Sequence, residues 1–228
     1  MYPTSSENIT VKSNDSFSNQ QVQTNNKKRY LISKRIIDFI LSLLGISILF
    51  PLFVLLAFII KVEEPRGPVI FKQIRIGKDG QAFYMYKFRS MVTNAEDLKV
   101  SLSNQNEAAG PVFKIKHDPR VTKVGWFIRK TSIDELPQLL NVLKGEMSLV
   151  GPRPPLPEEV EKYTSYERQR LSVIPGLTCY WQVSGRSNIS FDRWVELDLK
   201  YIKERNLFID IKLIFKTIFV LFGSKDAY

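Results

Sequence analysis

The chain has 228 residues, enough for one sizeable catalytic core with appendages but short for two full domains. Its 33 Lys and Arg residues outnumber its 23 Asp and Glu residues, and the formal charge of +10 indicates a polyanionic partner: nucleic acid, anionic lipid headgroups or phosphorylated substrates. A single cysteine, Cys179, and a single histidine, His117, exclude an intrachain disulfide framework, a multi-cysteine zinc site and a histidine-rich metal site.

Residues 1–29 are rich in Ser, Asn and Gln and end in the basic run Lys27–Arg29. Their few large apolar residues cannot bury enough surface for independent folding, so we predict a disordered polar tail. We expect no signal peptide, because the apolar segment begins late and no small-residue cleavage site follows it.

The segment from Phe39 to Ile60 contains no charged residue. As a helix it would be roughly 33 Å long, about the thickness of a bilayer's hydrocarbon core. We predict that it enters the membrane, since a buried core helix would keep a polar stripe. Basic residues on both flanks favour two cytoplasmic ends, and Pro51 predicts a sharp kink. These residues alone leave a re-entrant helix and an ordinary spanning helix equally open.

Further along the chain, the patterns predict a β-hairpin, several helices and an apolar C-terminal segment. Strands at Pro68–Lys72 and Phe83–Phe88 should flank a turn at Gly77–Gly80. Leu207–Phe222 suits either a helix in the headgroup layer or a core-packing terminal helix. The other expected helices are Ala95–Leu102, Val124–Val142 with an interruption around Thr131–Leu136, Glu158–Ile174 and Phe191–Lys203.

The segment Arg129–Gln138 contains two adjacent carboxylates, Asp134 and Glu135, beside basic residues. Ser132 is placed to cap the following helix, which would put both carboxylates in its first turn, where the helix dipole favours the ionised form. An ionised carboxylate there is a candidate nucleophile toward phosphorus, and its neighbour is a natural ligand for Mg²⁺. Taken alone, the same residues also make a good capping sequence without chemistry.

Three arginines could bring positive charge to this pair. Arg153 lies between prolines in Gly151–Pro155, on a rigid non-helical backbone that suits a phosphate clamp. Arg186 ends the turn Trp181–Arg186, and Arg129 precedes the two carboxylates. Together they could converge on a diphosphate next to a metal, although each one singly also fits a surface salt bridge.

Eight short segments occur in a fixed order along the chain: Lys34–Asp38, Tyr86–Met91, Asp118–Thr122, Ser132–Gln138, Asn141–Ser148, Gly151–Pro154, Pro175–Thr178 and Gln182–Arg186. This series resembles the bacterial sugar transferase family, the small monotopic phosphoglycosyl transferases. The resemblance runs from about Lys34 to the end of the sequence.

The resemblance implies an α+β, mainly helical fold in a monotopic membrane protein. Its re-entrant helix-break-helix would dip into one leaflet, with the break at Pro51. We therefore expect a tail at 1–29, a re-entrant membrane helix at 30–62 and a catalytic domain at 63–228, with a small β-hairpin and interfacial amphipathic helices. The expected location is the bacterial inner (cytoplasmic) membrane, with the active site on the cytoplasmic face.

The resemblance also implies transfer of a sugar 1-phosphate from a UDP-sugar to polyprenyl (undecaprenyl) phosphate, giving polyprenyl-diphosphate-sugar and UMP. This would be the first membrane step of capsule, exopolysaccharide or glycoconjugate assembly. Asp134 would form a covalent aspartyl-phosphosugar intermediate in a ping-pong reaction, and Glu135 would hold Mg²⁺, with Mn²⁺ as a substitute. Arg129, Arg153 and Arg186 fall on family positions thought to contact phosphates, whereas the roles of Lys87, Asp198 and Asp210 are less defined.

Two other classes of function are alternatives to this enzyme. A nucleic-acid-binding protein would cluster basic residues with aromatics on one face, whereas here the charge is spread, so we expect no nucleic acid partner. A catalytically idle, membrane-anchored scaffold of a polysaccharide assembly complex requires that Asp134 take no part in chemistry. The expected partners are a UDP-sugar, polyprenyl phosphate and anionic membrane lipids, with a homodimer left open. The end of the chain resembles glucose- and galactose-1-phosphate transferases.

Overall fold

The computed structural model describes residues 24–107, 113, 115–184 and 189–223. Most of the expected polar tail, and Arg186, lie outside these described residues. Helices predominate, with two small two-stranded sheets, so the expected mainly helical α+β class is confirmed. The elements, with η for a 3₁₀ helix, are α1 (Lys28–Glu63), β1 (Ile70–Ile76), η1 (Lys78–Gly80), β2 (Ala82–Phe88), α2 (Ala95–Ser101), η2 (Ser103–Gln105), α3 (Lys123–Lys130), η3 (Ile133–Gln138), α4 (Leu139–Lys144), β3 (Ser148–Val150), α5 (Pro157–Glu161), α6 (Ser165–Arg168), η4 (Gln169–Ser172), β4 (Gly176–Thr178), η5 (Trp181–Val183), α7 (Phe191–Glu204) and α8 (Leu207–Gly223).

Helix α1 is the only helix among the described residues that is long and apolar enough to cross a membrane. Most of its large apolar side chains point away from the protein; Ile48 is 75% exposed and Phe58 is 68% exposed. A continuous apolar surface of this size is unfavourable in water and favours burial in lipid.

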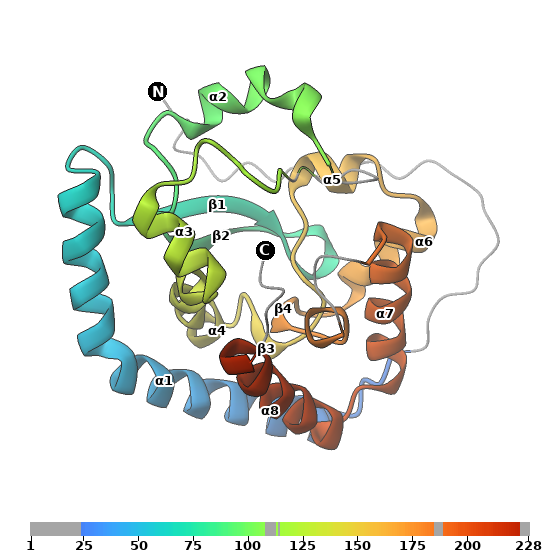
Figure 1. Ribbon diagram of the computed structural model, residues 1–228. Helices are drawn as coiled ribbons and strands as arrows, with labels where there is room; N and C mark the ends of the chain where they lie inside the picture. Colours follow the sequence, from blue (N-terminus) through green and yellow to red (C-terminus); the bar gives the residue numbers. More distant parts are fainter. Residues whose placement is uncertain (1–23, 108–112, 114, 185–188, 224–228) are drawn as a thin grey trace.

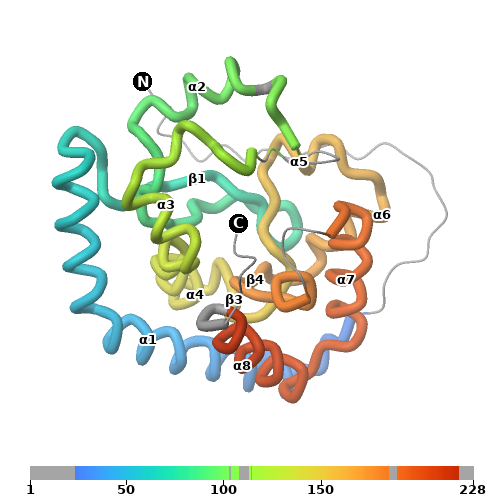
Figure 2. The backbone as a smooth tube through the Cα atoms, viewed as in Figure 1, coloured from blue at the N-terminus to red at the C-terminus, as the bar shows by residue number. Residues whose placement is uncertain are grey.

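The expected interruption of the helix at Pro51 is absent, because α1 stays helical through this residue. Instead, α1 changes direction part-way along its length, and its two arms enclose α3 and α4 (Figures 1 and 2). A proline removes one backbone donor and crowds the preceding turn, and a helix can absorb this by bending without ending.

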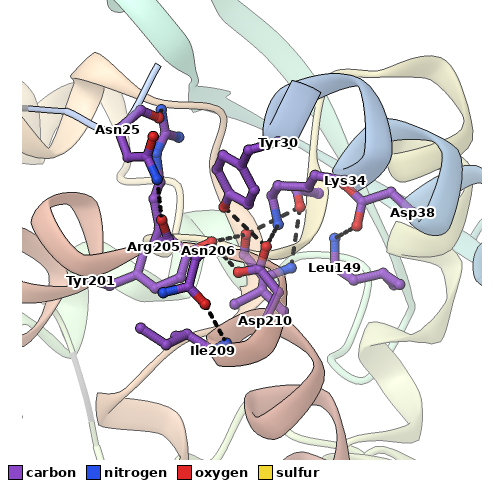
Figure 3. Close-up of polar contacts among 12 residues, drawn as sticks. Asn25, Tyr30, Lys34, Asp38, Leu149, Tyr201, Arg205, Asn206, Ile209 and Asp210 are labelled. Carbon is purple, nitrogen blue, oxygen red and sulfur yellow. Dashed lines mark hydrogen bonds and ion pairs between the residues drawn. The ribbon is translucent and has the colours of Figure 1, made fainter. Parts of the chain in front are cut away.

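The first turns of α1 are anchored by a buried polar cluster around Asp210 of α8 (Figure 3). Lys34 Nζ lies 3.1 Å from Asp210 Oδ2, and the Tyr30 hydroxyl donates to the same oxygen at 2.9 Å. The Tyr201 hydroxyl of α7 donates to the other oxygen, Oδ1, at 2.7 Å. Both Asp210 oxygens therefore have partners, which is the condition for burying a carboxylate.

The next polar residues of α1 bind the centre of the molecule. Asp38 accepts the backbone N–H of Leu149 in β3 at 3.1 Å. Arg35 donates to the carbonyls of Val142 and Leu143, near the end of α4, where helix carbonyls lack partners within the helix. The apolar helix is thus fixed to both β3 and α4.

The predicted hairpin is confirmed, although β1 begins two residues and ends four residues later than expected, and β2 begins one residue earlier. β1 and β2 pair antiparallel from Ile70 opposite Phe88 to Ile76 opposite Ala82. A second pair was not predicted: β3 and β4 are parallel, with Ser148 opposite Gly176. Strands of three residues leave no periodic pattern that sequence reasoning could detect.

The single charged helix expected over Glu158–Ile174 is wrong, because the chain forms α5, α6 and η4 there. Thr164 begins α6 with a capping box, in which its hydroxyl accepts the N–H of Glu167 and the Glu167 carboxylate accepts the N–H of Thr164. Such a reciprocal cap starts a new helix and so divides the segment.

Part of helix α8 packs into the core, which is one of the two interpretations that its sequence left open. Leu213, 2% exposed, packs into the largest hydrophobic cluster with residues of α7 and β3. On other sides of the helix, Phe208 and Phe219 are both 75% exposed. One face is therefore part of the core, and the exposed part of α8 carries large apolar side chains together with Lys212 and Lys216.

Candidate active site

The two adjacent carboxylates lie in the first turn of η3, as expected, but Ser132 does not cap this helix with its side chain. Ser132 adopts a left-handed backbone conformation (φ 55°) and makes no side-chain cap hydrogen bond to η3. The predicted cap is therefore wrong, because an N-cap residue needs an extended backbone to direct its oxygen at the helix. A left-handed non-glycine residue costs roughly 1–2 kcal/mol, and here it produces the sharp turn between α3 and η3.

Glu135 is held by two cations from separate parts of the chain. Lys87 Nζ of β2 lies 2.7 Å from Glu135 Oε1, and Arg153 Nη1, in the loop after β3, lies 3.7 Å from the same oxygen. Burial alone would raise the pKa of this carboxyl, but Lys87 and Arg153 outweigh it and lower the pKa to about 2. Glu135 is therefore ionised at neutral pH.

Asp134 behaves in the opposite way. Its side chain is buried, with the residue 7% exposed, and burial together with the charge of Glu135 raises its pKa to about 6, although Lys87 and Arg129 act to lower it. The site thus does not favour ionisation as strongly as its sequence suggested. Two neighbouring carboxyls with separated pKa values are typical of sites where they perform different tasks.

Two of the three arginines that were predicted to bind phosphate lie near this pair of carboxylates. Lys87 and Arg153 contact Glu135 directly, and Arg129 is near enough for its charge to lower the pKa of Asp134. Arg186 lies outside the described residues.

Arg75 of β1 was missed by sequence analysis. It is 6% exposed, and its Nη1 donates to the carbonyl of Pro154 at 3.0 Å, directly beside Arg153. An arginine within an alternating strand gives no sign in the sequence that it points inward, so no local pattern could have identified it.

Asp198 and Asp210 are placed in buried ion pairs away from the carboxylate pair. Asp198 is fully buried, and its Oδ2 accepts from Arg170 Nε at 2.8 Å and from Nη2 at 2.7 Å. Asp210 belongs to the α1 anchor shown in Figure 3. Through these ion pairs, Asp198 and Asp210 stabilise the fold.

The residues present fit a magnesium ion only if a substrate helps to hold it. The described residues contain no group of three or more His, Cys, Asp or Glu side chains that could bind a metal by themselves. Mg²⁺ commonly binds one or two carboxylates plus substrate phosphates and keeps several waters, and Glu135 would provide a carboxylate for it. Lys87 and Arg153 already neutralise part of the Glu135 charge, which weakens binding of a cation without substrate.

The arrangement is suited to displacement at phosphorus. Asp134 is a carboxylate that is ionised at neutral pH and can act as a nucleophile. Lys87, Arg129 and Arg153 supply positive charge that can offset the charge of a phosphate group during attack. The described residues bring these groups from β2, α3, η3 and the loop after β3 to one place.

Comparisons with known proteins show the family of this chain. Residues 29–224 match the family model described as bacterial sugar transferase. The chain is 46% identical over 224 residues to Galactosyl transferase CpsE of Streptococcus agalactiae serotype III, covering 96% of this chain and 49% of the relative. It is 45% identical over 213 residues to Undecaprenyl-phosphate galactose phosphotransferase of Salmonella typhimurium, covering 91% and 44%.

The chain spans about half the length of these two curated relatives. A shorter relative, Exopolysaccharide production protein ExoY of Sinorhizobium fredii, is 40% identical over 201 residues, which cover 86% of this chain and 88% of that protein. The family model extends from the second residue of α1 through the end of α8 and so includes the anchor, the hairpin and the carboxylate pair. This chain belongs to the bacterial sugar transferase family.

Proposed function

We propose that this protein transfers a sugar 1-phosphate from a UDP-sugar to polyprenyl (undecaprenyl) phosphate in capsule, exopolysaccharide or glycoconjugate assembly. The observation that carries the proposal is the buried Asp134 beside an ionised Glu135, with Lys87 and Arg153 next to them. The names of the Salmonella and Streptococcus relatives support the substrate class. The identity of the sugar is left to product analysis with a panel of UDP-sugars.

The reaction proceeds in two displacements. A carboxylate oxygen of Asp134 attacks the phosphorus that carries the sugar, and the bond from this phosphorus to the bridging oxygen breaks, so that UMP leaves with the bridging oxygen. A phosphate oxygen of polyprenyl phosphate then attacks the same phosphorus and releases the Asp134 carboxylate. Arg129 and Arg153 bind phosphate oxygens, and Lys87 keeps Glu135 in place.

We further propose that Glu135 and the substrate's phosphates hold Mg²⁺ during the reaction, with Mn²⁺ as a substitute. When bound, the ion supplies positive charge that offsets the diphosphate. Support comes from the low pKa of Glu135, which keeps a charged oxygen donor available at neutral pH.

We also propose that α1 is re-entrant and places the site on the cytoplasmic face of the bacterial inner membrane. The apolar exposed surface of α1, its bend and the basic residues on its two flanks support this topology. The basic flanks would also attract anionic lipid headgroups.

Replacing Asp134 by Asn should abolish the covalent step, because an amide is a far poorer nucleophile. Wild-type protein incubated with labelled UDP-sugar and no lipid acceptor should release about one equivalent of UMP and retain the sugar phosphate. The variant should release UMP at less than about one thousandth of the wild-type rate. Asp192→Asn, a matched change at an exposed position of α7, should have no effect. Wild-type protein that never releases UMP would instead favour the idle scaffold.

The rate of UMP release should fall as the pH drops through about 6, the value to which burial raises the pKa of Asp134. Because the reactive form is the carboxylate, the rate is constant above this pKa and falls about tenfold per pH unit below it. Lys87→Met removes the largest charge that lowers the pKa of Asp134, so the fall should move to higher pH. Single-turnover rates across the pH range measure both effects, and a profile that is identical in the variant contradicts the assignment.

Activity should be lost in excess chelator and restored by Mg²⁺ or Mn²⁺. Glu135→Gln should raise the metal concentration needed for half-maximal activity, since an amide carries no charge to balance the cation. Binding of Mn²⁺ in the presence of UDP, followed by electron paramagnetic resonance, separates metal binding from turnover. Full activity in chelator would show that no divalent ion is required.

A re-entrant α1 predicts that cysteines at Lys28 and Lys78, both exposed, are labelled only from the cytoplasmic side of oriented vesicles. The native Cys179 is fully buried and should give little background. Replacing Pro51 by Leu removes the constraint that favours a bend and should shift molecules toward a spanning helix. Labelling of the two positions from opposite faces in the unchanged protein would establish a spanning helix.

A further inference from the structure

Asn141 lies at the centre of α4, is fully buried, and has no part in the reaction proposed above. Its side chain makes three hydrogen bonds. Oδ1 accepts the backbone N–H of Tyr86 at 3.0 Å, and Nδ2 donates to the carbonyl of Tyr84 at 2.7 Å and to Glu146 Oε2 at 2.7 Å. An amide is the side chain that can offer a donor and an acceptor in this way, since a carboxylate accepts only and a leucine does neither.

Two of these bonds are made to the backbone of β2. Within the hairpin, Tyr84 pairs opposite Ile74 and Tyr86 opposite Lys72. The Tyr84 carbonyl and Tyr86 N–H that Asn141 contacts lie on the edge of β2 that does not face β1, as expected in an antiparallel pair where alternate residues direct their polar atoms outward. Asn141 therefore completes this edge as a neighbouring strand would.

This contact connects the two halves of the Lys87–Glu135 pair. Lys87 directly follows Tyr86 in β2, and its Nζ lies 2.7 Å from Glu135 Oε1. Glu135 lies in η3, which continues without a gap into α4 and Asn141. The amide thus fixes the backbone on one side of the ion pair to the backbone on the other.

We propose that Asn141 is a positioning residue for the transfer reaction, holding β2 at the place where Lys87 meets Glu135. The proposal rests on the proposed function, because Lys87 and Glu135 matter to the rate only if the pair beside Asp134 is the reacting centre. Loss of the amide leaves a buried carbonyl and a buried N–H of β2 without partners. Because unpaired buried polar groups are unfavourable, β2 should shift to pair them with other donors and acceptors. Movement of about 1 Å at a catalytic group can cost on the order of a hundredfold in rate.

The first test measures the position of Lys87 without any turnover. The side chain of Lys87 is 16% exposed in its pair with Glu135. In Asn141→Leu, which removes the hydrogen bonds and keeps the volume, an amine-reactive reagent should modify Lys87 faster than in wild type, as quantified by peptide mass spectrometry. Unchanged modification of Lys87 overturns the proposal.

The second test is a double-mutant cycle on UMP release. Asn141→Leu should lower the rate by about 10- to 100-fold in the wild-type background. In a Lys87→Met background the same change should alter the rate of UMP release by less than about twofold, because the Lys87–Glu135 pair is already absent. Equal losses in both backgrounds mean that Asn141 acts on folding alone, and the proposal fails.

Two matched variants separate positioning from general loss of stability. Val142→Ala removes packing from a fully buried neighbour on the same helix and leaves the bonds to β2 intact. It should lower the melting temperature without changing Lys87 modification. Glu146→Gln keeps an oxygen for Asn141 Nδ2 and should resemble wild type in both tests. If Val142→Ala accelerates Lys87 modification as much as Asn141→Leu does, the effect is not specific and the proposal is overturned.

If Asn141→Leu does not accumulate, Asn141→Ser replaces it in both tests, because a hydroxyl can still satisfy one β2 atom. The same outcomes then apply. Failure of the proposed function is recognised separately: wild-type protein would release no UMP, whereas the Lys87 modification experiment needs no substrate and would still report the role of Asn141.

Discussion

The structure depends on how an apolar helix pairs its buried charged side chains. In α1, Lys34 and Asp38 are 9% and 5% exposed, while most of the apolar residues around them are uncovered. A buried charge is tolerated only with partners, and Asp210 and the N–H of Leu149 provide them. These contacts fix α1 to α8 and β3, and Arg35 fixes it to α4. The helix that favours lipid is thereby joined to the elements that carry the candidate site.

The same rule of paired charges explains the site itself. Lys87 and Arg153 satisfy Glu135, so its neighbour Asp134 is left as the carboxyl whose charge is least compensated. Burial then separates the two pKa values, and of these two carboxyls Asp134 is the one that can change protonation near neutral pH. Lys87 lies on the β-hairpin and Arg153 lies in the loop after β3. Asn141 is hydrogen-bonded to β2 of the hairpin, and α1 is hydrogen-bonded to β3.

Local patterns predicted much of this fold and the core of its site. Short continuous stretches of sequence predict the apolar run of α1, the hairpin around Gly77–Gly80 and the carboxylate pair. The Lys87–Glu135 pair spans 48 residues of sequence and the Lys34–Asp210 pair spans 176, so periodicity could not reveal either. Ser132 was misjudged because its residue type favours a cap, whereas the turn between α3 and η3 requires a left-handed backbone. Family resemblance pointed to Lys87, Asp198 and Asp210 without telling which one meets the carboxylates.

The long sequence separation of the α1 contacts has a consequence for biosynthesis. Ribosomes make α1 before its partners, because the N–H that Asp38 binds comes 111 residues later and the carboxylate that Lys34 binds comes 176 residues later. Nascent α1 can therefore reach the lipid while its charged residues still lack their native partners, and non-local contacts of this kind form slowly. The contact between Lys34 and Asp210 cannot form until α8 has been made, so a chain truncated before α8 would retain the apolar helix and lose the carboxylate that joins it to α8.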